Sequence, residues 1–148
     1  MPIELLGIFD PASPDVPTDV SLPELLSLEP DLILVATPHD VAVDLVPQLL
    51  ATNANVFVEK PLAINEEELD KLVEVYNKNE TTVTVGFNRR FAPLAIQMKK
   101  VLGSVNSPMN IIATMNAGFI PSKVWVHDME IGGGRIIGEA CHFIDLIT

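Results

Sequence analysis

One run of residues, Asn55-Val56-Phe57-Val58-Glu59-Lys60-Pro61, joins a short apolar segment to an abrupt polar end. The lack of polar alternation in its first half predicts a buried strand, which the proline ends. Residues 32–36 have the same character, and residues 41–49 between the two runs carry apolar side chains at helical spacing. A strand, a helix and a strand with short links predict parallel strands, which indicate an α/β sheet with helices on both faces.

The same alternation continues on both sides of this unit. We expect strands at residues 3–9, 32–36, 55–58 and 82–87, and helices at residues 23–28, about 41–49, 66–76 and 93 to about 103. Ser21 is placed to cap the first helix, and Asn65 with Glu68 three residues on is typical of a capping box. Because residues 32–36 show no polar alternation, both faces of that strand are expected to be covered.

The alternation of predicted strands and helices ends before Pro108. Residues 109–115 predict a longer strand, and residues 117–130 predict an irregular loop that carries Trp125 and His127. The glycines at 132–134 then lead into a last helix. We therefore expect a change of domain between about 90 and 105.

Composition excludes several classes of protein. With 148 residues of which 48% are apolar, the chain is long and apolar enough for a core, and disorder is disfavoured. The single cysteine, Cys141, excludes an internal disulfide and fits a reducing compartment such as the cytoplasm. A net charge of −11 disfavours binding to nucleic acid or to an anionic membrane, and no apolar run is long enough to span a bilayer.

Polar residues follow each predicted strand. Open parallel sheets bind ligands outside the carboxyl ends of their strands. The four segments at such ends are Asp10, residues 37–39, residues 59–61 and residues 88–90. Residues 1–59 contain ten acids and no Lys or Arg, so Lys60 is the first cation of the chain. We expect these segments to converge on one crevice.

Two features in this set have competing interpretations. An acid placed like Asp10 binds ribose hydroxyls in dinucleotide folds, but an aspartate before a proline is equally typical of a turn. Gly132, Gly134 and Gly138 resemble the spacing of a phosphate loop, yet no convincing strand precedes them. Close packing at the start of a helix is the preferred interpretation of these glycines.

The predicted last helix carries one polar stripe. Arg135, Glu139 and His142 lie at i, i+4 and i+7, and Asp145 follows three residues later. Acids one turn away on either side would hold the histidine and raise its basicity, although a satisfied surface histidine would look the same. Cys141 and His142 are adjacent and point about 100° apart on a helix, which excludes a nucleophile–base dyad. The histidines and Cys141 show no metal-ligand spacing, so no metal is expected.

Four segments in this order resemble the Gfo/Idh/MocA oxidoreductases, named for glucose–fructose oxidoreductase, inositol dehydrogenase and a rhizopine-catabolism protein. The segments are Val35-Ala36-Thr37-Pro38-His39, Val58-Glu59-Lys60-Pro61-Leu62-Ala63, Val85-Gly86-Phe87-Asn88-Arg89-Arg90-Phe91, and Gly132-Gly133-Gly134 running on to His142 and Asp145. Residues 134–143 are also similar to a subgroup in which this module is joined to an alcohol-dehydrogenase-like half. The resemblance implies a truncated Rossmann-like domain at residues 1–90 and the start of an α+β substrate domain at residues 91–148.

The resemblance also implies roles for particular residues. Lys60 would lie beside the nicotinamide and the substrate hydroxyl, and His142 would be the general base in oxidation or the general acid in reduction. The residues implied to line the cofactor are Asp10, Ala36, Thr37, Pro38, His39, Glu59 and Lys60. Arg89 and Trp125 are candidates for substrate contact. NAD is favoured over NADP because Asp10 would oppose an added 2′-phosphate.

Two departures from the family pattern bear on function. Many members carry an acid four residues before the histidine, where this chain has Gly138; the neighbouring Glu139 would point about 100° away on a helix. The family also begins with a strand, a glycine loop and a helix that hold the pyrophosphate, and this unit is not present in the sequence. The chain therefore resembles the middle of a protein of roughly twice its length.

The resulting expectation is an oxidoreductase, as a fragment or split chain, that transfers a hydride between NAD(H) and a hydroxyl of a sugar, cyclitol or nucleotide-sugar. The alternative is a non-catalytic module or subunit that needs a completing partner chain for cofactor binding, or that forms a homo-oligomer. An exposed edge of the parallel sheet would promote such pairing.

Overall fold

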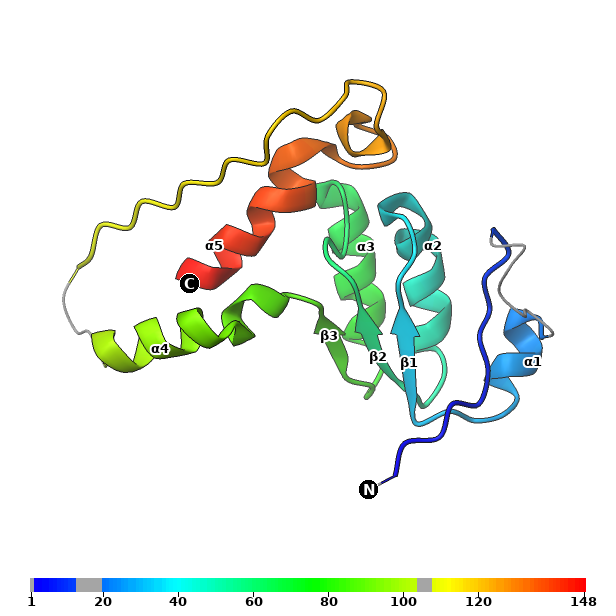
Figure 1. Cartoon of the computed structure of the whole chain (residues 1–148). Coiled ribbons are helices and arrows are strands. Elements are labelled where there is room, and N and C mark those ends of the chain that lie inside the picture. The colour runs from blue at the N-terminus through cyan, green and yellow to red at the C-terminus, as the bar shows by residue number, and fades with distance from the viewer. Residues whose placement is uncertain (1, 13–19, 104–107) are drawn as a thin grey trace.

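Three parallel strands form the centre of the molecule. The structure is a computed structural model that describes residues 2–12, 20–103 and 108–148. Strands β1 (Leu32–Val35), β2 (Asn55–Val58) and β3 (Val83–Val85) lie side by side in the order β1-β2-β3 (Figure 1). Both pairings are parallel, with Val35 opposite Val58 and Val58 opposite Val85. The predicted α/β fold with a parallel sheet is confirmed.

The crossover helices α2 (His39–Leu50) and α3 (Glu66–Tyr76) cover one face of this sheet (Figure 1). The core between helices and sheet consists of aliphatic residues, namely Val35, Ala42, Val46, Leu49, Leu50, Val56, Val58 and Leu72. Pro47 lies inside α2 and the helix continues through it. Burial of these side chains, each stabilising by about 1.5–3 kcal/mol, holds the sheet and the two helices together as one unit.

Local signals in the sequence set the starts of the helices. Ser21 caps α1 (Leu22–Leu26), and the side chain of Glu24 accepts a hydrogen bond from the backbone N–H of Ser21 in return. Asn65 caps α3 through the N–H of Glu68. The carboxylate of Glu68 accepts from the N–H of Ile64 rather than that of Asn65, so this cap reaches one residue further back than predicted.

The second face of the sheet differs from expectation. Leu32 and Leu34 on β1 remain 55% and 69% exposed, so the prediction that both faces of this strand are covered is wrong for the described part of the chain. The strand alternates after all: Val35 faces the helices, whereas Leu32 and Leu34 face away from them. An unbroken aliphatic sequence could not reveal which face the helices take, because both sets of side chains are equally apolar.

The N-terminal segment is also not the strand that was predicted. Residues 3–9 run without ladder pairing, and Ile3 and Leu5 are 96% and 76% exposed. A strand is stabilised by hydrogen bonds to a neighbour, and the sequence periodicity signals only that such a segment is apolar. No prediction from apolar content alone distinguishes a paired strand from an unpaired segment.

Residues 88–148 extend away from the sheet. The 3-10 turn η1 (Asn88–Phe91) leads into α4 (Pro93–Leu102), and Gly103 ends that helix as predicted. The strand predicted at residues 109–115 is not formed: this segment is extended but unpaired, and Ile112 is 92% exposed. It runs back along the molecule to the turn η2 (Trp125–His127), beyond which a π-helical turn, η3 (Ile136–Ala140), leads into α5 (Cys141–Ile147) (Figure 1).

The last helical run returns to the end of the sheet. Helix α5 packs against η1, so residues 141–147 lie beside the segment that follows β3. Of the helices in the described ranges, none is long and apolar enough to cross a membrane.

Candidate functional site

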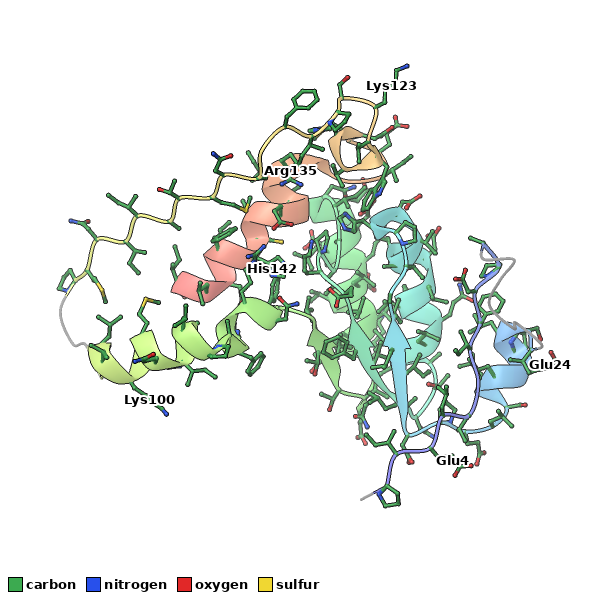
Figure 2. The ribbon with its side chains drawn as sticks, in the orientation of Figure 1. Glu4, Glu24, Lys100, Lys123, Arg135 and His142 are labelled. Carbon is green, nitrogen blue, oxygen red and sulfur yellow. The ribbon has the colours of Figure 1, made fainter. Side chains whose placement is uncertain are left out.

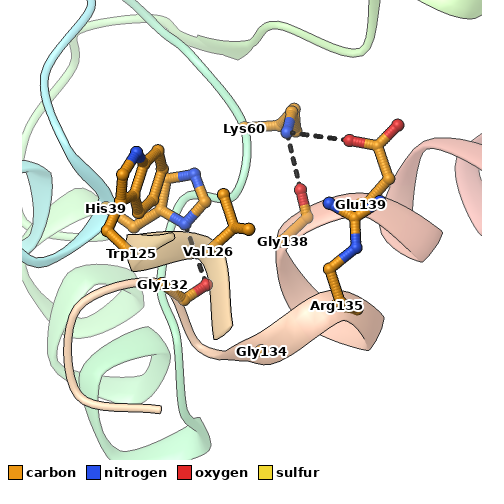
Figure 3. A pocket seen from close by; sticks show the side chains of 9 residues that line it. All are labelled: His39, Lys60, Trp125, Val126, Gly132, Gly134, Arg135, Gly138 and Glu139. Carbon is orange, nitrogen blue, oxygen red and sulfur yellow. Dashed lines mark hydrogen bonds and ion pairs between the residues drawn. The ribbon is translucent and has the colours of Figure 1, made fainter. Parts of the chain in front are cut away.

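Three of the four predicted strand-end segments meet the last helical run. Lys60, after β2, donates a hydrogen bond from Nζ to the carbonyl oxygen of Gly138 at 2.6 Å. Arg89, after β3, donates to Oε1 of Glu139 at 2.6 Å. His39, after β1, donates from Nδ1 to the carbonyl oxygen of Gly132 at 3.0 Å. Contacts between residues 50 to 93 positions apart in sequence therefore join the strand ends to residues 132–139. Figure 3 shows those of His39 and Lys60.

Asp10 does not share in this convergence. Its carboxylate accepts a hydrogen bond from the N–H of Ala12 at 3.0 Å, which closes a local turn. The structure thus realises the turn interpretation of Asp10, and none of the pocket-lining residues is in recorded contact with it.

The Lys60 side chain is fixed by contacts with residues 138 and 139. It follows β2 directly, and the N–H of Glu59 still bonds Val35, so the ladder continues to the residue before Lys60. The Lys60 side chain is 16% exposed, and its ammonium lies 3.7 Å from Oε2 of Glu139. An ammonium has three donors, and Gly138 and Glu139 lie on one side of it.

The π-helical turn explains why Glu139 reaches Lys60. The expectation that Glu139 points about 100° away from position 138 assumed an α-helix, and the structure has a π-helical turn at residues 136–140 instead. Hydrogen bonding from i to i+5 places an extra residue in the turn and rotates the following side chains. A Cβ at Gly138 would lie 3.1 Å from the carbonyl oxygen of Gly132 and 3.3 Å from Cε1 of His39. A side chain at position 138 would therefore be tightly packed against Gly132 and His39, and the acid of this turn stands at position 139.

Glu139 is an ionised bridge between two cations. Burial opposes its charge, but the hydrogen bond from Arg89 and the charges of Lys60 and Arg89 outweigh burial and hold the pKa of Glu139 below its ordinary value. The Arg89 guanidinium also stacks over the Phe143 ring at 4.7 Å. Arg89, named beforehand only as a candidate for substrate contact, thus connects η1 to the last helical run.

His142 lies inside the site and is 6% exposed. The interpretation as a surface histidine does not fit this burial. Its ring meets Phe87 edge-on at 6.2 Å, and its Nδ1 is buried without a hydrogen-bond partner among the described residues. Figure 2 shows His142 on α5 on the side that faces the rest of the molecule.

The basicity of His142 is lowered, contrary to the sequence-based prediction. Burial, and after it the charges of Lys60 and Arg89, depress the pKa of His142, whereas Glu139 and Glu59 act in the opposite direction with smaller effect. Asp145, the other acid expected to support the histidine, pairs with Arg90 instead. The neutral imidazole is therefore the favoured form, which suits a proton acceptor.

The remaining predicted cofactor residues lie at the end of β1. The hydroxyl of Thr37 is buried and has no hydrogen-bond partner within the described chain. Ala36 and Pro38 on either side of it are exposed. His39 is buried, and its ring meets the Trp125 ring edge-on at 5.0 Å, which brings the loop at 117–130 into the site.

A small pocket of about 120 Å³ opens at this junction (Figure 3). Its lining residues are His39, Lys60, Trp125, Val126, Gly132, Gly134, Arg135, Gly138 and Glu139. Sequence reasoning assigned no site role to Val126, Arg135 or Glu139, although the polar stripe already placed Arg135 and Glu139 on one side of the helix. The described residues include no group of three or more His, Cys, Asp or Glu side chains placed to hold a metal ion.

Cys141 lies next to this site without the properties of a nucleophile. It is a free thiol of intermediate exposure, and burial raises its pKa, so it remains protonated at neutral pH.

Comparisons with known proteins show which family the chain resembles. Residues 8–87 match the sequence model of Gfo/Idh/MocA, described as an oxidoreductase family with an NAD-binding Rossmann fold. The chain is 29% identical over 124 residues to oxidoreductase P35 of Formosa agariphila, covering 78% of this chain and 39% of that protein. It is 29% identical over 72 residues to inositol 2-dehydrogenase of Rhizobium meliloti, covering 49% of this chain and 22% of that enzyme.

A solved structure shows the same likeness in three dimensions. The WlbA dehydrogenase of Thermus thermophilus, in complex with NAD and UDP-GlcNAcA, superposes with a TM-score of 0.63 at 25% identity, covering 79% of this chain and 39% of that one. The chain thus spans well under half the length of these relatives. With more than half of its residues matched by the family model, the chain belongs to the Gfo/Idh/MocA oxidoreductase family.

Proposed function

We propose that this chain carries the catalytic centre of an NAD(H)-dependent dehydrogenase that acts on a hydroxyl of a sugar, cyclitol or nucleotide-sugar. The observation that carries the proposal is the contact of Lys60 with the carbonyl of Gly138, 78 residues away in sequence. Gly138 lies four residues before His142 in the same helical run, and the charge of Lys60 acts on the imidazole of His142. We infer that one substrate hydroxyl contacts both side chains.

The two side chains have complementary tasks at that hydroxyl. Oxidation of a carbinol removes the hydroxyl proton, and the buried, neutral His142 is suited to accept it. Lys60 stabilises the developing charge on the same oxygen with its ammonium. In reduction, the protonated His142 returns the proton. When bound, the nicotinamide supplies the site that accepts or donates the hydride.

The residues at the end of β1 fit the polar part of such a cofactor. Thr37 offers a buried hydroxyl that lacks a partner, and Lys60 follows the neighbouring strand at the same end of the sheet. NAD is proposed over NADP because the matching family model is described as NAD-binding; the sequence argument from Asp10 is not supported by its place in a local turn. The WlbA relative is in complex with NAD, and a biliverdin reductase of similar fold is in complex with NADP+.

Calorimetric titration of the purified chain with NADH and NADPH tests the proposal. We expect NADH to bind more tightly than NADPH, and Lys60→Ala to weaken NADH binding about tenfold. Lys78→Ala, which removes an exposed ion pair with Glu74 of α3, is expected to leave NADH binding unchanged. Equal affinities of wild type and Lys60→Ala for NADH would overturn the placement of the nicotinamide beside Lys60.

A second candidate function is a module that requires a completing chain. The exposed Leu32 and Leu34 favour it, because an apolar sheet face of this kind is normally covered in parallel sheets. In that case the chain alone gives no heat with either cofactor, and binding returns only when a polypeptide that covers β1 is added.

A further inference from the structure

The pocket beside Lys60 carries more positive charge than the protein around it. Its lining includes two cations, Lys60 and Arg135, and one acid, Glu139. Both oxygens of that acid are already engaged, one by Arg89 and one by Lys60. The chain as a whole has a net charge of −11, so a cationic pocket runs against its composition.

Arg135 is the cation of this pocket without a recorded partner. No ion pair or side-chain hydrogen bond joins it to any described residue, whereas Lys60, Arg89 and Arg90 are all paired. It follows Gly134, whose φ of 72° turns the chain into the π-helical turn, and it lies on the same side of the pocket as Gly138 and Glu139 (Figure 3). Arg135 thus lines the pocket from the residue that immediately precedes the π-helical turn.

The electrostatic effect on His142 is consistent with an excess of positive charge in the site. Lys60 and Arg89 lower the pKa of His142 by more than Glu139 and Glu59 raise it. Positive potential therefore reaches the imidazole despite two nearby carboxylates. One cation is enough to stabilise the alkoxide that forms from a neutral hydroxyl, and Lys60 provides it. Arg135 is therefore an additional cation that the proton transfer itself does not require.

We propose that Arg135 binds an anionic substituent of the substrate, a carboxylate or a phosphate, so that the dehydrogenase proposed above acts on anionic sugars in preference to neutral ones. This inference rests on the proposed function, because it assigns the substrate class of the same site. A guanidinium matches both anions with two parallel donors. The pocket volume of about 120 Å³ is well below that of sites for whole ligands, and it suits a substituent.

Binding of small sugars to the 148-residue chain, with and without saturating NADH, tests the inference. The probes are D-glucuronate, D-glucose 6-phosphate, D-glucose and inorganic phosphate, measured by calorimetry at low ionic strength. We expect at least one of the two anionic sugars to bind about tenfold or more tightly than glucose, which converts to the strength of one charge-assisted hydrogen bond. The carboxylate and phosphate arms distinguish the two anions, and inorganic phosphate measures the anion alone.

Variants at Arg135 assign the effect to one side chain. Arg135→Gln is expected to weaken binding of the preferred anionic sugar about 10- to 100-fold and to leave glucose unchanged. Arg135→Lys keeps the positive charge but loses the two parallel donors of the guanidinium, so it should bind the anionic sugar more tightly than Arg135→Gln and less tightly than the wild type. Lys123→Gln is the matched control, since Lys123 lies on the loop at residues 117–130 and does not line the pocket (Figure 2).

The outcomes separate this inference from the proposed function. Arg135-dependent binding of an anionic sugar without any NADH binding supports the inference and removes the dehydrogenase proposal. NADH binding with equal affinities for glucose and the anionic sugars overturns the inference alone. A loss of NADH affinity in Arg135→Gln as large as the loss of sugar affinity assigns Arg135 to the cofactor and also overturns it. If neither ligand binds, both are overturned.

Discussion

Residues 32–87 and residues 91–148 are held in place by different forces. The first region has its own core, in which Leu49, Leu50 and Val58 are 0–1% exposed. In the second, α4 buries no residue, and Leu94 and Val101 remain 79% and 81% exposed. The second region meets the first through η1, the glycines at 132–134 and the charged groups around Lys60.

This difference explains where the candidate site forms. The sheet unit supplies rigid strand ends, and the last helical run supplies polar side chains that reach them. Apolar packing stabilises the first region independently of the site, whereas the placement of α5 depends on the site's own hydrogen bonds and ion pairs. Substitutions in the two regions should therefore have unlike effects on stability.

The largest contrast is expected between two leucines. Leu49→Ala removes a fully buried side chain and should lower the free energy of unfolding by about 2–5 kcal/mol. Leu94→Ala removes an exposed one and should change it by less than about 0.5 kcal/mol. Urea unfolding followed by circular dichroism measures both. Similar losses for the two variants would mean that α4 is buried in solution, contrary to the comparison.

The glycine junction between the regions gives the next contrast. Gly133 and Gly118 have φ values of 67° and 68°, but a Cβ at Gly133 would lie 2.9 Å from Cβ of Ile64, whereas one at Gly118 meets nothing within 4 Å. Both alanine variants carry a left-handed backbone cost of about 1–2 kcal/mol, and Gly133→Ala adds the collision. We expect Gly133→Ala to melt lower than Gly118→Ala in a thermal scan. A lower melting temperature for Gly118→Ala would contradict the close approach at Ile64.

Sequence reasoning predicted the first region better than the second for a physical reason. Leu32–Val35, Asn55–Val58 and the capped helix after Asn65 are determined by local periodicity and local hydrogen bonds, which the sequence displays directly. Residues 3–9 and 109–115 are similarly rich in apolar side chains. A strand also needs a neighbouring strand to pair with, and within the described chain no strand pairs with either segment. Apolar content predicts burial and cannot supply the partner.

The sequence predicted which residues form the site better than it predicted how their side chains are arranged. The rule that ligand sites lie at the carboxyl ends of parallel strands brought together His39, Lys60 and Arg89, since it depends only on parallel topology. The π-helical turn at residues 136–140 was not predictable from spacing, which assumes 3.6 residues per turn. The lowered pKa of His142 was missed for a different reason: burial and the charges of Lys60 and Arg89 come from tertiary contacts that helix spacing does not show.

The ion-pair bridge between the regions can be broken at Glu139. Glu139→Gln leaves Lys60 and Arg89 without their shared charge and should cost about 1–2 kcal/mol, because the carboxylate is only 20% exposed. Hydrogen exchange should quicken in residues 136–147 before it changes in β2. Glu74→Gln, at an exposed pair on α3, is the control and should have a smaller effect. Equal effects of the two variants would show that the bridge does not hold α5.

The smallest expected effect is the pH dependence contributed by His142. Its pKa in the folded chain lies below the ordinary value of 6.5, so the unfolded chain binds this proton more readily than the folded one. The stability that neutral His142 contributes is therefore fully present above pH 6.5 and falls as the pH drops below that value toward the folded pKa. His142→Asn should reduce the loss of stability over that pH range, whereas His127→Asn, at an exposed position, should leave the pH dependence of stability unchanged.

NMR titration of His142 tests the link between the ion-pair bridge and the histidine. Glu139 raises the pKa of His142, so Glu139→Gln should move the His142 titration midpoint to still lower pH. A shift of the midpoint to higher pH would refute this electrostatic link.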